Sequence, residues 1–292
     1  MSINESTPGN DAGKAYVQRL EHAATTIREH FGTVPDTLVI LGSGLGTLTE
    51  LMKTRATLSY RSIPHMPQAS TDGHAGNLVV GSFGEREVAI FQGRVHCHDG
   101  LPPCEVAFGI RVMVYLGVKH LVVTNAAGSI REGMKVGDLM VIDNHLSLFL
   151  PEDPSLGLEH PLLGDKFYAQ TDPYDKELGD LFLKEAAQRG WADRCHRGTY
   201  CFLPGPRYES RADINFLRAL GVADAVGMST VPEVLAGIQM TRGALRVLGV
   251  STITNVAAGL SQEEPNHAEV KAAGIEAAPR LRELITQVIR SL

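Results

Sequence analysis

Three apolar segments of this 292-residue chain each run directly into a turn of small residues, and this repeated pattern constrains the fold more than any other feature. The segments cover residues 37–41, 121–124 and 225–227, and Gly, Ser, Thr, Asn and Ala follow them. A fourth strand-like segment ends in an arginine and a histidine two positions apart, Arg94 and His96. Apolar strands of this kind are typical of a sheet covered on both faces, and ligands of such sheets lie beyond the carboxyl ends of the strands. The pattern therefore predicts one phosphate-binding pocket assembled from several strand ends.

Helical and extended patterns alternate along the chain, which predicts an α/β fold. Residues 148–173 are rich in Pro, Gly and Asp without periodicity and predict a long functional loop. No break in composition divides the chain, so we expect a single domain over residues 15–292 after a disordered N-terminal arm, residues 1–14. Helices are expected at residues 15–31, 106–115, 176–189, 210–220, 232–242 and from 267 to the end, and strands at residues 37–41, 77–82, 87–92, 121–124, 139–142, 198–203, 223–227 and 246–254.

The overall charge argues against a protein that binds nucleic acid or a membrane surface through a large basic patch. The formal net charge is −6 and 43% of the residues are hydrophobic, which is ordinary for a globular domain without a basic footprint for nucleic acid or membrane. Any anion must therefore be held by a local site. The polar N-terminus lacks the apolar core of a signal peptide, no apolar run has the length of a membrane span, and the four cysteines form no CxxC pair. We expect a cytoplasmic protein.

Arg94 and His96 carry the sharpest chemical signal. On an extended strand, residues two apart point to the same side, and a guanidinium fork matches phosphate oxygens. The alternative is an ordinary arginine–carboxylate pair beside a surface histidine. His96 and His98 also form an HxH pair, and Asp143 with His145 could be added to it as metal ligands. Nothing in their spacing requires a metal, so we expect none.

Two of the turns have alternatives as well. The glycines of Gly42–Gly46 allow close backbone approach and Ser43 adds a hydroxyl, but the segment could be only a tight strand–helix turn. It is not a Walker loop, since no Gly-Lys-Ser/Thr follows, and its spacing departs from the dinucleotide-binding pattern. Ser229–Glu233 has the hydroxyl caps, proline and acid of a helix start, which could serve capping alone or an anion as well.

Three further polar residues are candidates for hydrogen bonds to a polar ligand. Glu209 follows a Pro-Gly-Pro turn, Asn255 ends an apolar strand, and His267 precedes the last helical pattern. An asparagine at such a position can both donate and accept hydrogen bonds. None of the three is diagnostic by itself, since Glu209 could only complement a helix dipole and His267 could be a surface residue.

Taken in order, these segments resemble the trimeric purine nucleoside phosphorylases over about residues 38–275. The Val-Gly-Met-Ser-Thr-Val-Pro-Glu stretch is the most specific of them. The resemblance implies a single α/β domain around a distorted mixed sheet flanked by helices, a homotrimer, and no cofactor, with inorganic phosphate as co-substrate. The matching segments are Gly42–Gly46, Gly73–Gly76, Gln92–His96, Thr124–Gly128, Gly205–Glu209, Val226–Glu233, Ile253–Asn255 and Asn266–Val270.

The resemblance also implies roles for single residues. Phosphate would be held by Ser43, Arg94, His96, Ser229 and the Ala126 backbone amide, with His74 close by. The purine site would comprise Glu209 and Asn255, with Tyr208 packing on the base, together with Ala127, Gly128, Val226 and Gly227. Met228, His98 and His267 would line the ribose. Asn255, Glu209 and His96 would be the catalytic residues.

The implied reaction is attack of phosphate on ribose C1′ while the purine leaves. Asn255 would donate to N7 or O6 as charge develops on the base, and Glu209 would accept from N1–H. Adenine lacks that proton, so the resemblance implies a preference for inosine and guanosine over adenosine. The alternatives are a phosphorylase that prefers xanthosine or methylthioadenosine, a hydrolytic nucleosidase, a non-catalytic nucleoside-binding protein and a metallohydrolase.

The sequence departs from the family at three places. His98 stands where familiar members have a tyrosine that faces the ribose, and it could donate to phosphate or ribose or titrate near neutral pH. Val256 replaces the lysine of animal enzymes. The aromatic residue that a neighbouring subunit lends to the site aligns with Leu163, and Phe167 or Tyr168 are the possible substitutes.

Overall fold

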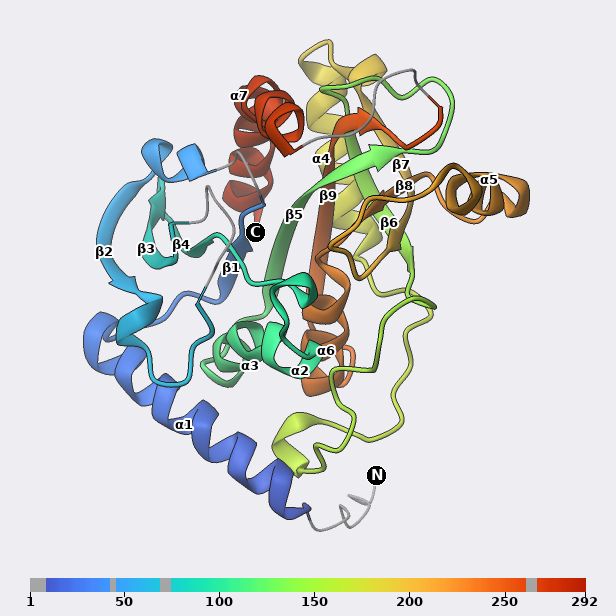
Figure 1. Cartoon of the computed structure of the whole chain (residues 1–292). Coiled ribbons are helices and arrows are strands. Elements are labelled where there is room, and N and C mark those ends of the chain that lie inside the picture. Colours follow the sequence, from blue (N-terminus) through green and yellow to red (C-terminus); the bar gives the residue numbers. More distant parts are fainter. Residues whose placement is uncertain (1–8, 43–45, 69–74, 261–266) are drawn as a thin grey trace.

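A computed structural model describes residues 9–42, 46–68, 75–260 and 267–292, with the backbone alone for residues 46, 47, 267 and 268 (Figure 1). It confirms the α/β class. The strands are β1 Thr37–Ile40, β2 Lys53–Ser59, β3 Asn77–Phe83, β4 Arg86–Gln92, β5 His120–Ser129, β6 Leu139–Leu146, β7 Cys195–Phe202, β8 Ala225–Gly227 and β9 Arg246–Val256. The α-helices are α1 Asp11–Phe31, α2 Pro103–Val106, α3 Phe108–Tyr115, α4 Lys176–Gln188, α5 Arg211–Leu220, α6 Val231–Thr241 and α7 His267–Ser291.

The strands form one mixed sheet that closes on itself at one end. Their order is β2-β3-β4-β1-β5-β8-β7-β6-β9, and β9 also pairs with β5. This additional pairing joins β5, β8, β7, β6 and β9 into a ring, while β2, β3, β4 and β1 extend from it as an open wing. β4, β1 and β5 are parallel neighbours, and Ile40 lies opposite both Phe91 and Val123. Their carboxyl ends therefore meet at one edge of the sheet.

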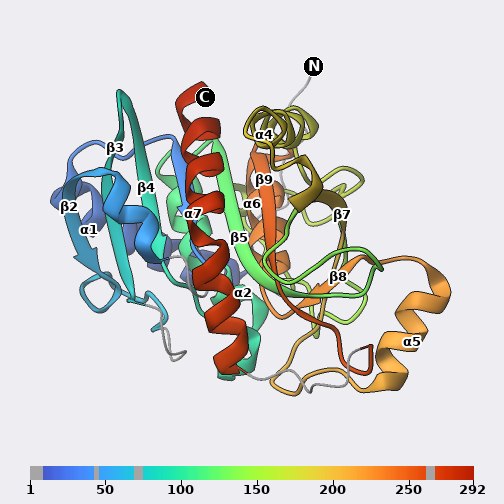
Figure 2. The same ribbon diagram turned by 90° about the horizontal axis from the view of Figure 1, so that it is seen from above.

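Helices cover both faces of the sheet. Alternate residues of β1 belong to two different cores: Leu38 and Ile40 pack with α1, α3 and α6, whereas Val39 packs with α4 and α7. Figure 1 shows these two helical layers on opposite sides. A third, smaller core joins α5 to the β8 region, where Figure 2 shows this helix standing apart. Burial on both faces explains why the central strands are continuously apolar.

Several element boundaries differ from the sequence expectation. α1 begins at Asp11, capped by the Asn10 side chain, so the helix starts within the predicted disordered arm. The expected helix over residues 106–115 is two helices that join at Ala107. β2 was not predicted because it is an edge strand with one buried residue, Leu58, and so lacks an apolar pattern. β5 continues through the predicted turn after Thr124. The sequence suggested a turn there because the small residues that follow Thr124 have low β-propensity.

The segment of residues 148–173 is a loop, as expected, whose regular structure is the short 3₁₀ helix Pro161–Leu163. It is fixed to the body of the protein by Arg111, a fully buried residue of α3. Both terminal nitrogens of its guanidinium donate to the Pro154 carbonyl at 3.1 Å. The loop is therefore packed against the helical layer.

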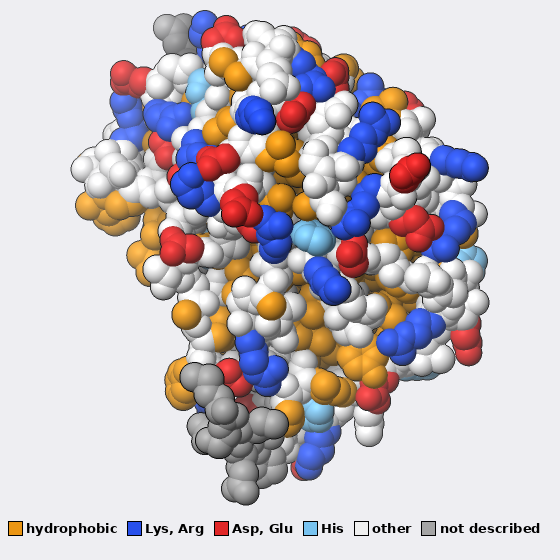
Figure 3. All heavy atoms as spheres, turned by 180° about the vertical axis from the view of Figure 1, so that it is seen from behind, with side chains coloured by type: hydrophobic (Ala, Val, Ile, Leu, Met, Phe, Trp, Pro, Cys, Tyr) orange, Lys and Arg blue, Asp and Glu red, His pale blue; other side chains and the backbone are white. Residues whose placement is uncertain are grey.

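The outer surface carries charges of both signs. On the face shown in Figure 3, lysine and arginine side chains are interspersed with aspartate and glutamate. Within the described residues, no helix is long and apolar enough to cross a membrane.

Candidate active site

A cavity of about 320 Å³ opens where β4, β1 and β5 end and where the ring of strands begins. The thirteen predicted site residues that the structure describes with their side chains all line it. Ser43 and His74 lie outside the described residues, as does the side chain of His267. The thirteen are Arg94, His96, His98, Ala126, Ala127, Gly128, Tyr208, Glu209, Val226, Gly227, Met228, Ser229 and Asn255.

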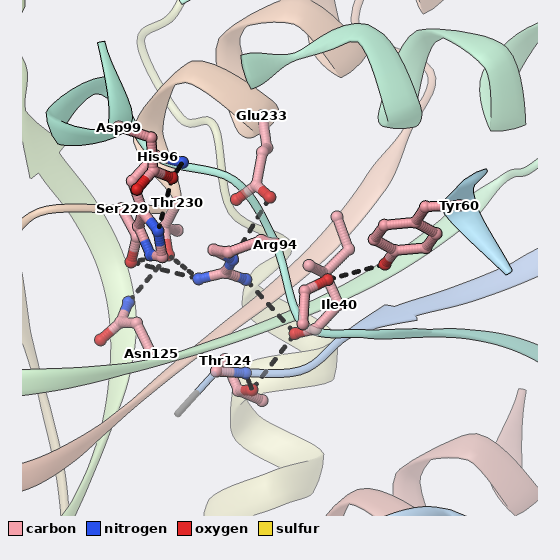
Figure 4. Close-up of polar contacts among 12 residues, drawn as sticks. Ile40, Tyr60, Arg94, His96, Asp99, Thr124, Asn125, Ser229, Thr230 and Glu233 are labelled. Carbon is pink, nitrogen blue, oxygen red and sulfur yellow. Dashed lines mark hydrogen bonds and ion pairs between the residues drawn. The ribbon is translucent and has the colours of Figure 1, made fainter. Parts of the chain in front are cut away.

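Arg94 anchors one half of this cavity and is 4% exposed. The sequence suggested that Arg94 lies on an extended strand, but the structure places it after the strand. β4 ends at Gln92, and Gly93 turns the chain with φ 101°, a conformation that favours glycine. The guanidinium donates through Nη1 to Ser229 Oγ at 3.1 Å and through Nη2 to the Ile40 carbonyl at 3.3 Å (Figure 4).

The sequence left open an ordinary arginine–carboxylate pair beside a surface histidine. The structure contains such a pair, but the histidine is buried. Nε of Arg94 lies 3.3 Å from Oε1 of Glu233, in the first turn of α6. His96, however, is buried and faces the same cavity as Arg94 instead of the surface. Arg94 therefore forms an ion pair with Glu233 and also lines the cavity together with His96.

His96 and His98 form a stacked pair, with ring centroids 4.4 Å apart and ring planes 12° apart. Asp99 lies beside both rings, 3.7 Å from His96 Nδ1 and 3.5 Å from His98 Nδ1, and accepts from the His96 backbone amide at 2.8 Å. Burial lowers the pKa of His96, Arg94 and His98 add to this effect, and Asp99 opposes it. A ring nitrogen binds a metal in the plane of its ring. These three side chains lie close enough to be candidate ligands, but the stacked rings would have to rotate before both could hold one ion.

The start of α6 differs from the predicted capping motif. Thr230 is the N-cap residue, yet its own side chain makes no capping hydrogen bond. Its hydroxyl instead accepts from Arg94 Nη1 at 3.2 Å and from Asn125 Nδ2 at 3.0 Å. The Ser229 hydroxyl also lies at Arg94, and the Ser229 amide donates to the Tyr200 hydroxyl at 3.3 Å. Both hydroxyls therefore accept from Arg94, and the Thr230 hydroxyl does not cap the helix.

The other half of the cavity is built by strand register. Gly128 of β5 lies opposite Val226 of β8 on one side and Asn255 of β9 on the other. Asn255 Nδ2 donates to the Val256 carbonyl at 3.1 Å, and its Oδ1 accepts from Thr254 Oγ1 at 3.2 Å. These bonds fix the amide plane at the cavity wall.

Glu209 and Tyr208 close this half from the segment before α5. Burial raises the pKa of Glu209, and the nearby Asp213 adds to the rise. Tyr208 remains 38% exposed. An acceptor carboxylate, an amide and an aromatic ring thus face an arginine, a histidine and a serine hydroxyl across one cavity.

Comparisons with known proteins agree with this geometry. A family model described as "Phosphorylase superfamily" matches residues 36–290. The chain is 39% identical over 276 residues to the purine nucleoside phosphorylase of Bos taurus, covering 93% of this chain and 94% of that protein. It is 40% identical over 252 residues to purine nucleoside phosphorylase 1 of Bacillus subtilis (strain 168), covering 86% of this chain and 90% of that protein. The chain belongs to the purine nucleoside phosphorylase family.

Solved structures of this family have the same fold. The crystal structure of Schistosoma mansoni purine nucleoside phosphorylase in complex with inosine matches with a TM-score of 0.87 and 35% identity, covering 94% of this chain and 97% of that chain. Membership of the purine nucleoside phosphorylase family and the expected α/β fold with a mixed sheet flanked by helices are therefore confirmed. As a purine nucleoside phosphorylase, the protein is an enzyme, a pentosyltransferase.

Sequence reasoning gave no site role to several residues of this purine nucleoside phosphorylase. Asn125 lines the cavity, and Thr230, Glu233 and Asp99 contact its predicted residues. Glu233 did carry a signal. Every residue from Val231 to Met240 is buried, so an acid in this otherwise largely apolar helix requires a buried partner.

Proposed function

We propose that this enzyme catalyses reversible phosphorolysis of 6-oxopurine nucleosides, yielding the free base and ribose or deoxyribose 1-phosphate in purine salvage. The observation that carries the proposal is the single cavity in which Arg94, His96 and Ser229 face Glu209 and Asn255. Inorganic phosphate is the co-substrate, and we propose that no further cofactor is needed. We also propose a cytoplasmic location.

Phosphate would occupy the half of the cavity beside Arg94. The guanidinium and the Ser229 hydroxyl supply donors, and the N-terminus of α6 adds the positive end of a helix dipole. A neutral His96, favoured by its burial, would offer a ring N–H without adding a full charge. A phosphate dianion held here stabilises positive charge that develops on the sugar as the glycosidic bond breaks.

The base would leave from the half formed by Glu209 and Asn255. An amide nitrogen carries two hydrogens, and Val256 accepts one of those of Asn255. The second is available for purine N7 or O6, where negative charge accumulates in the transition state. The carboxylate of Glu209 would accept from N1–H, which inosine and guanosine possess and adenosine lacks. This polar match supports the 6-oxopurine preference.

A substrate panel tests the proposal. Inosine, guanosine, xanthosine, adenosine and methylthioadenosine are each incubated with and without phosphate, and base release is followed. We expect phosphate-dependent release from inosine and guanosine above that from adenosine. Comparable rates on adenosine and inosine would overturn the preference, and a higher rate on xanthosine or methylthioadenosine would redirect it. Release without phosphate would indicate a hydrolase, binding without release a non-catalytic protein, and loss of activity with a chelator a metal-dependent mechanism.

We further propose that the enzyme is a homotrimer in which a neighbouring subunit closes the ribose site with Phe167. Leu163, the aligned residue, is only 1% exposed and packs in the core of its own subunit. The Tyr168 hydroxyl donates to Asp153 at 2.8 Å within the same loop. Phe167 is 88% exposed and so is available to a partner. Sedimentation equilibrium tests the trimer, and a monomeric mass at micromolar concentration would refute it.

A further inference from the structure

Arg111 is a fully buried arginine whose described hydrogen-bond partners are all uncharged oxygens. Its terminal nitrogens donate to the Pro154 carbonyl at 3.1 Å each, to Gln239 Oε1 at 3.2 Å and to the Tyr16 hydroxyl at 3.4 Å. Burial of a cation is costly unless an opposite charge or several hydrogen bonds compensate it, so stability alone gives little reason for a guanidinium here. Its contacts indicate instead that it holds the loop of residues 148–173, to which Pro154 belongs.

One series of contacts leads from Arg111 through Pro154 to Tyr168. Asp153, the residue before Pro154, accepts a hydrogen bond from the Tyr168 hydroxyl at 2.8 Å. Tyr168 follows Phe167 directly in the chain. The contact of Arg111 with Pro154 therefore helps to fix the backbone on the carboxyl side of Phe167.

A second series of contacts leads through α6 to the other side of Phe167. The Gln239 side chain is buried, accepts from Arg111 and donates through Nε2 to the Asp165 carbonyl at 3.2 Å. Gly164, the residue before Asp165, packs so closely that a Cβ there would overlap the Gln239 carbonyl oxygen. The loop backbone therefore lies directly on the last turn of α6.

The two series of contacts end on either side of Phe167, whose own side chain is 88% exposed. Because so little of this ring packs against its own subunit, its position depends on the backbone that these contacts fix. We propose that Arg111 is a positioning residue that holds Phe167 in place for the neighbouring subunit and so acts on the ribose site of that subunit. This inference rests on the proposed trimer and deepens it. An aromatic side chain already held in position loses less entropy when nucleoside binds, which strengthens the complex.

Substitution of Arg111 by methionine tests this role. R111M keeps a long side chain and removes every donor. We expect KM for inosine to rise about fivefold and KM for phosphate to change less than about twofold, because the phosphate half lies at the opposite end of α6.

The matched control is R19M. The guanidinium carbons of Arg19 and Arg111 both lie 5.3 Å from the centroid of the Tyr16 ring, but Arg19 pairs with Glu105 and not with the loop. R19M should leave both KM values unchanged. An equal change in R19M, or an equal rise of both KM values in R111M, would overturn the inference.

A double-mutant cycle with F167A shows whether Arg111 acts through this aromatic residue. In the F167A background, R111M should raise KM for inosine less than about twofold further. The same increase in both backgrounds would contradict the mechanism. Circular dichroism checks the fold of each variant, and Q239M replaces R111M in these tests if the R111M protein does not fold.

Mixed trimers test the action across subunits. R111M has a complete cavity and an impaired loop, whereas N255A has an intact loop and lacks the proposed donor to the base. In a ring the loop of one subunit serves the next, so cavities of R111M subunits lie beside loops of N255A subunits. At inosine concentrations below KM, co-expressed R111M and N255A should release hypoxanthine about twofold faster than the same two enzymes mixed as separate trimers. Equal rates would overturn the inference.

Two measurements on the wild-type enzyme distinguish this inference from the proposals on which it rests. A monomer in sedimentation equilibrium would refute the trimer, and failure to phosphorolyse inosine would refute the proposed function, and the inference falls with either. A trimeric, active enzyme in which R111M behaves as the wild type would refute the role of Arg111 alone.

Discussion

Arg94 and Glu233 form an ion pair that is almost completely shielded from solvent, with Nε and Oε1 3.3 Å apart and side-chain exposures of 3% and 4%. The pair connects the segment after β4 to the first turn of α6, so it joins the two elements that supply the phosphate half of the cavity. Burial raises the pKa of Glu233, and the charge of Arg94 counteracts this rise. Glu233 holds one edge of the guanidinium while the other nitrogens remain directed toward Ser229, Thr230 and Ile40.

Replacement of Glu233 by glutamine should destabilise the protein and strengthen its dependence on phosphate. E233Q leaves a buried guanidinium without its counter-charge, and breaking a buried pair in this way costs about 3–5 kcal/mol. Bound phosphate would supply the missing negative charge. Urea unfolding with and without phosphate measures both effects. The control is E283Q, because Glu283 pairs with Arg189 near the surface and should matter by less than about 1 kcal/mol.

Equal stability of E233Q and the wild-type protein would contradict this reading of the pair. So would a phosphate-induced stabilisation of E233Q no larger than that of the wild-type enzyme.

Glu209 should link activity and stability to pH in opposite directions. Its pKa is raised by burial, and the ionised carboxylate is a stronger acceptor from purine N1–H than the protonated acid, so kcat/KM for inosine should fall as the pH drops through this raised pKa. For a group whose pKa is higher in the folded protein than in the unfolded chain, the contribution to stability is fully present at pH values below the unfolded-state pKa. This contribution is lost as the pH rises through the folded-state pKa. At pH 7 E209Q should therefore unfold at a higher temperature than the wild type while losing roughly 10–100-fold in kcat/KM.

The measurements are a pH–rate profile and thermal unfolding at pH 7. E132Q is a suitable control, since Glu132 is exposed on the surface and pairs with Arg218. If E209Q melted below the wild type at pH 7, or retained the acid limb of the profile, the assigned role of Glu209 would be wrong.

Phe167 should contribute to nucleoside binding only if subunits associate. F167A is expected to raise KM for inosine several-fold and to change KM for phosphate little, because the side chain would act at the ribose. L162A is a matched control from the same loop, where Leu162 is 44% exposed and Phe167 is 88% exposed. The kinetics of F167A, L162A and the wild-type enzyme are compared at enzyme concentrations above and below that at which the subunits dissociate. An F167A enzyme with wild-type kinetics would leave the neighbouring-subunit role without support.

The pocket could be predicted from residues close together in the sequence. Contacts between residues far apart in the sequence could not be predicted in this way. The apolar strands and the small residues after them indicated where ligands bind, and Arg94, His96 and Ser229 do share one cavity. The partner of Arg94 was missed because Glu233 is 139 positions away and its acid looked like a helix-dipole residue. Closure of the ring was missed for the same reason, since β5–β9 pairing joins segments more than a hundred residues apart.

Errors of local detail have local causes. The geometry expected for Arg94 and His96 assumed a continuous strand, but Gly93 with φ 101° turns the chain first. The hydroxyls at residues 229 and 230 suggested capping, because sequence spacing cannot show that Thr230 takes a positive φ that directs its oxygen to Arg94 and Asn125.

Asn255→Asp should shift the substrate preference toward 6-aminopurines. In the wild-type protein the amide nitrogen donates to the Val256 carbonyl at 3.1 Å, and Oδ1 already accepts from Thr254. An aspartate places an oxygen against that carbonyl, which favours a protonated side chain or one turned toward the base. Its oxygens can accept from the 6-amino group of adenine, but the carboxylate repels O6 of hypoxanthine. We expect the ratio of kcat/KM for adenosine to that for inosine to rise about tenfold or more.

The ratio is measured for N255D, the wild type and N215D, in which an exposed asparagine of α5 is changed to match the added charge. N215D should keep the wild-type ratio. A shift in N255D alone would assign reading of the purine 6-position to Asn255, because the two substitutions add the same charge and differ only in where it lies. An unchanged ratio in N255D would mean that this position does not distinguish the two classes of base, and the 6-oxopurine preference would then have to come from Glu209.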